Sequence, residues 1–422
     1  MQQISKLPNF KWLTRLVKIE AGEGRASLIS FSIFFFLLCG YYILRPIRDS
    51  MAITGGVDNI QWLFTATFVG ILIIVPLFGW ACSRLRRAVL ISSVYGIIII
   101  TLTLFYALFW HYPDSLWIAR SFYIWVSIFN LMMLSVFWSL MADVFNSEQS
   151  HRLFSFIAAG GSLGALTGPL ISALLVVQIG HQQLLLISIC CFIAVVGLVL
   201  LLLRQVNPQA AKKDHELPIP GNPFAGFSLI IKTPYLLGYS LFLFLLSAIS
   251  TFLYFQQAQL MSELLPDAQA RTQLFAWIDV SVSALSIFFQ LLVTGNIVKR
   301  FGVAIVLTLS PILLMLGFIS FAWHPILFVV VATGMIRRVG AYAFIRPCRE
   351  MLFTNLDREM KYKAKNFIDT VVYRGGDTIS SWFYATCVSF GLTLVGTAII
   401  GAFIAAITGG VGYLLGKKHE YR

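Results

Sequence analysis

The stretch ASLISFSIFFFLLCGYYILRPIRD, residues 26–49, decides the fold class of this chain. Its first 19 residues carry no charge, and a helix of about 20 apolar residues crosses the ~30 Å hydrocarbon core of a bilayer. The run ends in Arg45-Pro46-Ile47-Arg48-Asp49. Because ionisable side chains at membrane depth are costly unless they face a partner or a water-filled cavity, the stretch predicts a membrane-spanning helix that ends in functional charges.

The same charge pattern returns 301 residues later as Arg346-Pro347-Cys348-Arg349-Glu350. In each copy the arginines are three residues apart and share a helix face, and the acid follows the first arginine by four residues. An ion pair at that spacing would neutralise the first arginine and leave the second without a local partner. Since a guanidinium presents a planar fork of donors suited to phosphate or carboxylate, we favour an anion clamp or gate over purely structural pairing.

The composition of the whole chain is that of an all-α integral membrane protein. Of its 422 residues, 58% are hydrophobic and 12% are charged, and its mean hydropathy is +0.83; soluble globular domains do not reach these values. No small-residue cleavage site precedes the first apolar run, so we expect no removable signal peptide. Twelve transmembrane helices are predicted near 26–46, 60–81, 88–110, 116–141, 153–178, 183–203, 235–256, 272–295, 303–323, 325–346, 367–390 and 393–416.

Positive charge gathers in alternate loops and at both ends of the chain, and this distribution explains the net charge of +13. The remaining loops offer only Arg271. By the positive-inside rule this asymmetry places both termini in the cytoplasm, and an even number of spans requires the same. The basic balance therefore reflects membrane topology, and we expect no nucleic-acid partner. The basic segments include Arg84/Arg86/Arg87, residues 204–232, Lys299/Arg300, residues 358–365 and Lys417/Lys418/Arg422.

A charged, proline-containing segment divides the spans into six and six. It runs from Arg204 to about Lys232 and reads as a semi-rigid linker. Two six-helix halves joined by a central cytoplasmic loop resemble the architecture of the major facilitator superfamily. The predicted organisation is a cytoplasmic segment 1–25, an N-terminal half 26–203, a linker 204–234, a C-terminal half 235–416 and a cytoplasmic tail 417–422.

Several classes of chemistry have no signature in the sequence. There is no phosphate-binding glycine loop followed by Lys-Ser/Thr, no His-Glu-x-x-His and no nucleophile elbow. The six cysteines lie in or beside the spans without metal-ligand spacing. We therefore expect a carrier and not an enzyme, with no cofactor and no metal site. The stripe of Gly160, Gly164 and Gly168 is predicted to allow close helix packing.

Charged residues inside the spans are the candidates for function. Arg337 and Arg338 lie about 12 residues after Pro325, which places them near the middle of the bilayer, where carriers of this architecture bind substrate. A lone acid such as Asp279 could carry a proton or simply pair with an arginine across the bundle. We predict that the substrate is bound by Arg45, Arg48, Arg337, Arg338, Arg346 and Arg349. Gating or coupling is assigned to Asp49, Asp143, Asp279, Glu350, Lys363, Lys365 and Asp369.

Four segments resemble the ATP/ADP translocase family of plastids and intracellular bacteria, which exchanges nucleotides and is distantly related to the major facilitator superfamily. They are Ile43–Asp49, Phe137-Trp138 through Arg152-Leu153-Phe154, Lys232–Leu237 and Lys361–Asp369.

The resemblance implies roles for the family's first-span basic residue at Arg48, its fourth-span acid near Asp143 and its later basic residue at Lys363 or Lys365. It also implies a bacterial inner-membrane location. The family's seventh-span glutamate is absent, because this chain has Tyr254-Phe255-Gln256-Gln257 there, and this departure bears on nucleotide specificity.

The leading hypothesis is a monomeric secondary transporter that moves a small anionic, nucleotide-like solute by alternating access between its halves. A proton-coupled carrier of another organic anion, with Asp279 or Asp143 as the proton site, is the first alternative. A non-transporting membrane receptor or scaffold is the second. Because spans one and ten run in opposite directions, Arg45/Arg48 and Arg346/Arg349 are expected toward opposite ends of one central cavity, with Arg337/Arg338 between them.

Overall fold

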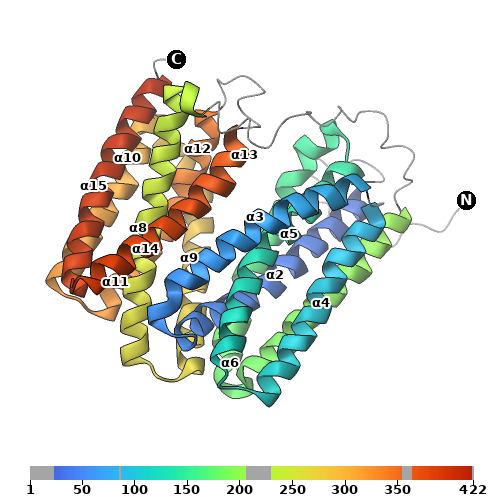
Figure 1. Ribbon diagram of the computed structural model, residues 1–422. Helices are drawn as coiled ribbons and strands as arrows, with labels where there is room; N and C mark the ends of the chain where they lie inside the picture. The colour runs from blue at the N-terminus through green and yellow to red at the C-terminus, as the bar shows by residue number, and fades with distance from the viewer. Residues whose placement is uncertain (1–22, 85–86, 206–229, 354–363, 421–422) are drawn as a thin grey trace, which may run out of the picture.

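The computed structural model describes residues 23–84, 87–205, 230–353 and 364–420. These residues form two bundles of helices that stand side by side (Figure 1). The N-terminal half of the chain builds one bundle and the C-terminal half builds the other. Most of the predicted linker, residues 206–229, lies outside the described residues.

The N-terminal bundle contains a long helix that is in fact two spans. Within α6 the backbone of Gly180 has φ 79° and ψ 176°, a conformation that only glycine adopts readily, so the chain reverses there. Residues before and after Gly180 are therefore the fifth and sixth spans. The bundle consists of α2 (Gly24–Thr54), α3 (Ile60–Arg84), α4 (Arg87–His111), α5 (Leu116–Val144) and α6 (Ser147–Gln205), with the short η1 (Val57–Asn59) after α2.

The C-terminal bundle contains two spans that are interrupted by π-helical segments. The tenth span is α11 (Leu327–Gly340), η3 (Ala341–Ile345) and α12 (Arg346–Leu352); the eleventh is α13 (Lys365–Phe367), η5 (Ile368–Val372) and α14 (Tyr373–Ser389). π-Helical segments are rare in proteins, and those that occur often lie at functional sites. The other helices are α8 (Pro234–Leu264), α9 (Ala268–Leu292), α10 (Thr294–Trp323) and α15 (Leu394–Glu420).

The predicted all-α membrane fold is confirmed. Ten helices are long and apolar enough to cross a bilayer, α6 provides two spans, and the more polar α13–α14 path provides the last. The described residues thus contain twelve spans, six in each bundle. The chain is a multi-pass membrane protein.

The two ends of the bundles differ in how they meet. We call the end that carries Gly24 and Glu420 the near side, and the end that carries Thr54 and Leu264 the far side. At the far side, Ile53 and Ile60 of the N-terminal bundle are buried in an apolar cluster made mostly by the C-terminal bundle. The far side is therefore where the halves close on each other.

Hydrogen bonds between the halves follow the same asymmetry. Among the described residues they join helix segments at the far side or at mid-depth, and the near-side helix ends bond within their own half. The bonds are Ser50–Ala268, Thr54–Arg271, His181–Thr272, Ala173–Gln273, Ala165–Ser283, Phe64–Thr378 and Thr65–Trp382. The halves are sealed at the far side and diverge toward the near side.

The glycine stripe of the fifth span packs directly on α2. A Cβ atom added at Gly160 would lie 2.5 Å from the carbonyl oxygen of Phe31, and one at Gly168 would lie 2.5 Å from that of Cys39. A Cβ at Gly164 would overlap the carbonyl oxygen of Phe35. The predicted close packing is confirmed, and it fixes the helix that carries Arg45 and Arg48.

Candidate functional site: an arginine-lined central cavity

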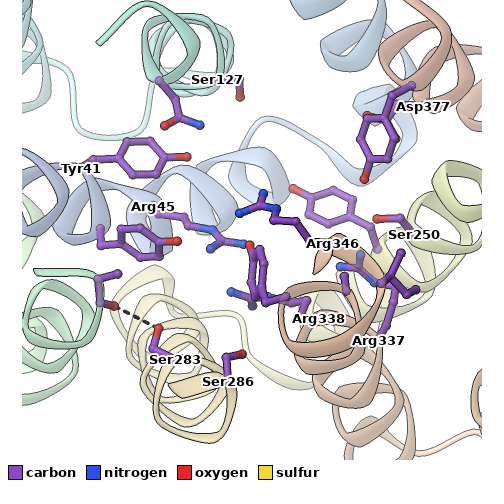
Figure 2. A pocket seen from close by; sticks show the side chains of 18 of the residues that line it. Tyr41, Arg45, Ser127, Ser250, Ser283, Ser286, Arg337, Arg338, Arg346 and Asp377 are labelled. Atoms are coloured by element: carbon purple, nitrogen blue, oxygen red, sulfur yellow. Dashed lines mark hydrogen bonds between the residues drawn. The ribbon is translucent and has the colours of Figure 1, made fainter. Parts of the chain in front are cut away.

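A cavity of about 940 Å³ lies between the two bundles (Figure 2). Its lining contains seven arginines and four acids, an excess of three positive charges. The lining reaches toward the near side at Phe34 of α2 and Ala158 of α6, and the cross-half contacts close the far side. The cavity therefore faces the near side. The charged residues of the lining are Arg45, Arg48, Asp49, Arg337, Arg338, Arg346, Arg349, Glu350, Asp369, Arg374 and Asp377.

Asp279 forms the charged centre between the halves. Its carboxylate accepts a hydrogen bond from Arg338 of α11 and lies 3.7 Å from the Nε atom of Arg45 in α2. Asp279 is only 2% exposed and sits just behind the lining residue Ile278. Of the two interpretations left open by the sequence, the structure favours pairing with arginines across the bundle.

Neither pentapeptide forms the ion pair expected at four-residue spacing. In the first copy, Asp49 pairs with the adjacent Arg48 at 2.6 Å, while Arg45 turns to Asp279. The simple internal pairing is thus wrong for this copy, because tertiary neighbours at the same depth offer the first arginine a buried carboxylate. Arg48 and Asp49 together occupy the part of the cavity closer to the far side.

The second pentapeptide is also partnered by other helices. Arg349 donates to Asp369 of η5 and, over 2.9 Å, to the hydroxyl of Tyr239 in α8. Glu350 accepts from Lys365 of α13 at 2.5 Å. Here too the first arginine, Arg346, is not paired with its own acid. These contacts link the tenth span to α8 and to the eleventh span near the near side.

Two cavity arginines have no ion-pair partner among the described residues. The Nε atom of Arg337 is buried and makes no hydrogen bond, and the side chain of Arg346 is exposed to the cavity, over the ring of Tyr342. Figure 2 shows Arg45, Arg338 and Arg346 converging on the centre of the cavity, with Arg337 beside them. An anion placed there would meet guanidinium donors from both halves.

The wall contributed by the N-terminal bundle is rich in aromatic rings. Tyr41, Tyr123 and Trp138 all line the cavity, and the guanidinium of Arg48 lies over the ring of Tyr123, 5.6 Å from its centroid. Asn130 lies on the same wall. Flat rings next to amide and guanidinium donors can stack on and hydrogen-bond to a planar heterocycle.

Not every predicted site residue reaches the cavity. Asp143 lies at the near-side end of α5, outside the lining. Lys365 is outside the lining and donates a hydrogen bond to Glu350, which belongs to it. Lys363 falls outside the described residues. The roles predicted for these three residues stay predictions.

The lining also contains residues absent from the predicted site. Arg374 and Asp377 belong to the eleventh span, and their position among apolar residues of a predicted span could have identified them. The aromatic wall carried no such signal, because rings in a membrane helix serve packing just as well.

The two pentapeptides lie at different depths along their helices. Arg45 lies nine residues before the far-side end of α2 and Arg346 lies 19 residues after the far-side start of α11, about 14 Å and 28 Å along the respective helices. Their long side chains nevertheless reach the same central space.

Comparison with known proteins is consistent with a carrier. The model of the Major Facilitator Superfamily matches residues 29–349. ADP,ATP carrier protein 1 of Chlamydia muridarum is 21% identical, over 92% of this chain and 87% of the relative, which confirms the resemblance seen in the sequence. The crystal structure of nucleoside transporter NupG aligns with a TM-score of 0.65 and 14% identity, covering 94% of this chain and 98% of that one. A bacterial homologue of the iron transporter ferroportin in the inward-facing state aligns with a TM-score of 0.67 and 14% identity, covering 94% and 99%. This chain belongs to the Major Facilitator Superfamily and has the fold of its transporters.

Proposed function

We propose that this transporter exchanges nucleotide-like anions across the bacterial inner membrane, with both termini in the cytoplasm. The observation that carries the proposal is the arginine excess of the cavity, in which Arg337 and Arg346 have no ion-pair partner among the described residues. Charges of this kind are costly in a membrane protein unless they are used. A multivalent anion would satisfy them.

The aromatic wall supports a nucleotide over a simple inorganic anion. A nucleotide combines a charged phosphate chain with a flat base, and the cavity combines converging arginines with the rings of Tyr41, Tyr123 and Trp138. Phosphates would bind at Arg337, Arg338 and Arg346, and the base would lie against the opposite wall. The match to the ADP,ATP carrier protein 1 of Chlamydia muridarum, which extends over most of both chains, supports the same substrate class.

Asp279 supplies a mechanism for alternating access. In the present state the carboxylate of Asp279 pairs with Arg45 and Arg338, which are the donors that a phosphate would use. A bound anion would take over these arginines, release Asp279 and draw the near-side ends of the halves together. The cavity would then open at the far side. Because the arginines leave Asp279 only when an anion replaces it, the empty carrier would not reorient, and transport would be an exchange of one anion for another.

Counter-exchange in proteoliposomes tests the proposal. Vesicles loaded with ADP should take up radiolabelled ATP or ADP, and empty vesicles should not. The double variant R337Q/R346Q should abolish uptake, whereas R300Q, which lies outside the cavity lining, should retain it. Failure of every nucleotide to exchange, with uptake of another organic anion instead, would favour the alternative carrier and overturn the nucleotide assignment.

A further inference from the structure

We propose that Asp377 is a proton-binding site of the carrier and that its protonation is linked to anion binding through Arg374. The inference rests on the proposed function only for the identity of the anion. Asp377 lies on α14 and lines the cavity, yet it is 8% exposed. It is a protonatable group to which neither the comparisons nor the exchange mechanism assigns a role.

The carboxylate of Asp377 has the loosest pairing of the four acids in the lining. Its Oδ2 atom lies 3.6 Å from Nη1 of Arg374, beyond hydrogen-bond distance. Asp49 and Glu350 have partners at 2.6 Å and 2.5 Å, and Asp369 accepts directly from Arg349. A buried carboxylate with a distant counter-charge is the kind of group that gains a proton when that charge moves away.

Ser247 of α8 makes the site equally suited to both protonation states. Its hydroxyl lies 2.7 Å from Oδ1 of Asp377 and 3.1 Å from the carbonyl oxygen of Tyr373. When Asp377 is ionised, the hydroxyl donates to the carboxylate. When Asp377 is protonated, its O–H can donate to the serine oxygen while the serine donates to the Tyr373 carbonyl. The Oδ1 atom of Asp377 and the hydroxyl of Ser247 therefore keep their mutual hydrogen bond in either state.

The surroundings favour a proton over a metal ion. The guanidinium of Arg374 lies beside the carboxylate of Asp377 on the same helix. The positive charge of Arg337 in α11 also attracts this carboxylate. Tyr373 is the neighbouring titratable group, and α3 presents the ring of Phe68 to this part of α14. The two nearby guanidinium groups would repel a metal ion and outweigh the single carboxylate, and the described part of the chain contains no cluster of metal-binding side chains.

Arg374 connects the proton site to the anion site. Its side chain is 36% exposed to the cavity, against 12% for Asp377, so it can turn toward an incoming anion. The carboxylate of Asp377 then loses its counter-charge and accepts one proton from water, becoming a neutral carboxyl group. Binding of the anion and uptake of the proton therefore favour each other, as linkage requires.

Infrared difference spectroscopy of the purified protein tests the proton site without any substrate. Acidification should produce the carbonyl stretch of a buried protonated carboxyl group, and D377N should lack that band. E263Q, which removes an exposed acid at the far-side end of α8, is the matched control and should keep the band. S247A should retain the band with a shifted position and titration midpoint. A band that survives in D377N would overturn the proposal.

Transport with ADP as the probe tests the linkage. A proton gradient, acidic on the side of the vesicle membrane from which ADP is taken up, should accelerate ADP uptake by wild type about tenfold over its own rate at equal pH. D377N should lose this acceleration, whatever its own rate at equal pH. D377E should restore it. Equal acceleration in D377N, or acceleration by a sodium gradient instead, would overturn the linkage. If no variant transports ADP, the proposed substrate fails, and the infrared result still decides whether Asp377 binds a proton.

Discussion

Asp279 of α9 holds Arg45 of α2 across the boundary between the two halves, with 3.7 Å between the carboxylate and the Nε atom. Arg338 of α11 donates to the same carboxylate. One buried acid therefore pairs with an arginine from each half. Because the cavity lies directly beside this group, any anion that binds there competes with Asp279 for the same donors.

Replacing Asp279 with Asn should strengthen anion binding and lower the stability of the protein without ligand. The two arginines lose their buried counter-charge, so we expect about 1–3 kcal/mol less stability without ligand. A phosphate no longer has to displace a carboxylate, so ADP should bind about tenfold more tightly. Thermal unfolding with and without ADP measures both effects. An ADP affinity equal to that of wild type would contradict the competition between Asp279 and the anion.

Replacing Arg337 with Gln should weaken anion binding without lowering the stability of the protein without ligand. The buried Nε atom of Arg337 has no hydrogen-bond partner, so the empty protein should unfold at an unchanged or higher temperature. A charge-assisted hydrogen bond to the anion is lost, which we expect to weaken binding by about 1.5–3 kcal/mol. Isothermal titration with ADP checks this, with R300Q as the control outside the cavity. Undiminished binding by R337Q would show that the anion does not use this residue.

Replacing Arg271 with Gln should loosen the far-side seal. Arg271 is 6% exposed and donates to the carbonyl oxygens of Leu265 and Pro266 and to the hydroxyl of Thr54 in the other half. Loss of these bonds should shift the population toward a state that is open at the far side.

Spin labels at two exposed far-side positions report this shift. Asp58 lies in the N-terminal half and Glu263 in the C-terminal half. The distance distribution between labels at these positions should gain a longer component in R271Q. R25Q, an exposed change at the near-side start of α2, should leave it unchanged. An unchanged distribution in R271Q would mean that the remaining far-side contacts, among them those of Ile53 and Ile60, hold the seal without Arg271.

The fold could be predicted from the sequence because membrane spans follow from local composition. Apolar length gives each span, and the alternation of basic loops gives the topology, with no knowledge of tertiary contacts. The break at Gly180 falls in the predicted loop between 178 and 183 for the same reason. Only the π-helical segments η3 and η5 had no local signal.

The candidate site was predictable in its residue types and unpredictable in its partners. Arg45, Arg48, Arg337, Arg338, Arg346 and Arg349 all line one cavity, because charge inside a span has few other places to go. Their pairing depends on the relative depth and rotation of different helices. The sequence spacing suggested Arg45 with Asp49, whereas the assembled bundle offers Arg45 the deeper carboxylate of Asp279.

Adding a methyl group at Gly164 should destabilise the carrier through its helix packing. A Cβ atom at this position would overlap the backbone carbonyl of Phe35 and lie 2.9 Å from the amide nitrogen of Cys39. Neither backbone atom can move without shifting α2 against α6. We expect G164A to lose about 1–3 kcal/mol of stability, the usual cost of overpacking a tight interface.

Gly197 in the sixth span provides the matched control. A Cβ atom there would meet nothing within 4 Å, so G197A should be neutral or slightly stabilising, since alanine favours helix over glycine by about 1 kcal/mol. Thermal unfolding of both variants separates packing from helix propensity. Because Gly161 and Ala165, which flank Gly164, line the cavity, G164A should also slow ADP exchange. A G164A protein that unfolds and exchanges like G197A would mean that α2 is free to move away from α6, and the arginines on α2 would then have to be positioned by Asp279 and the anion alone.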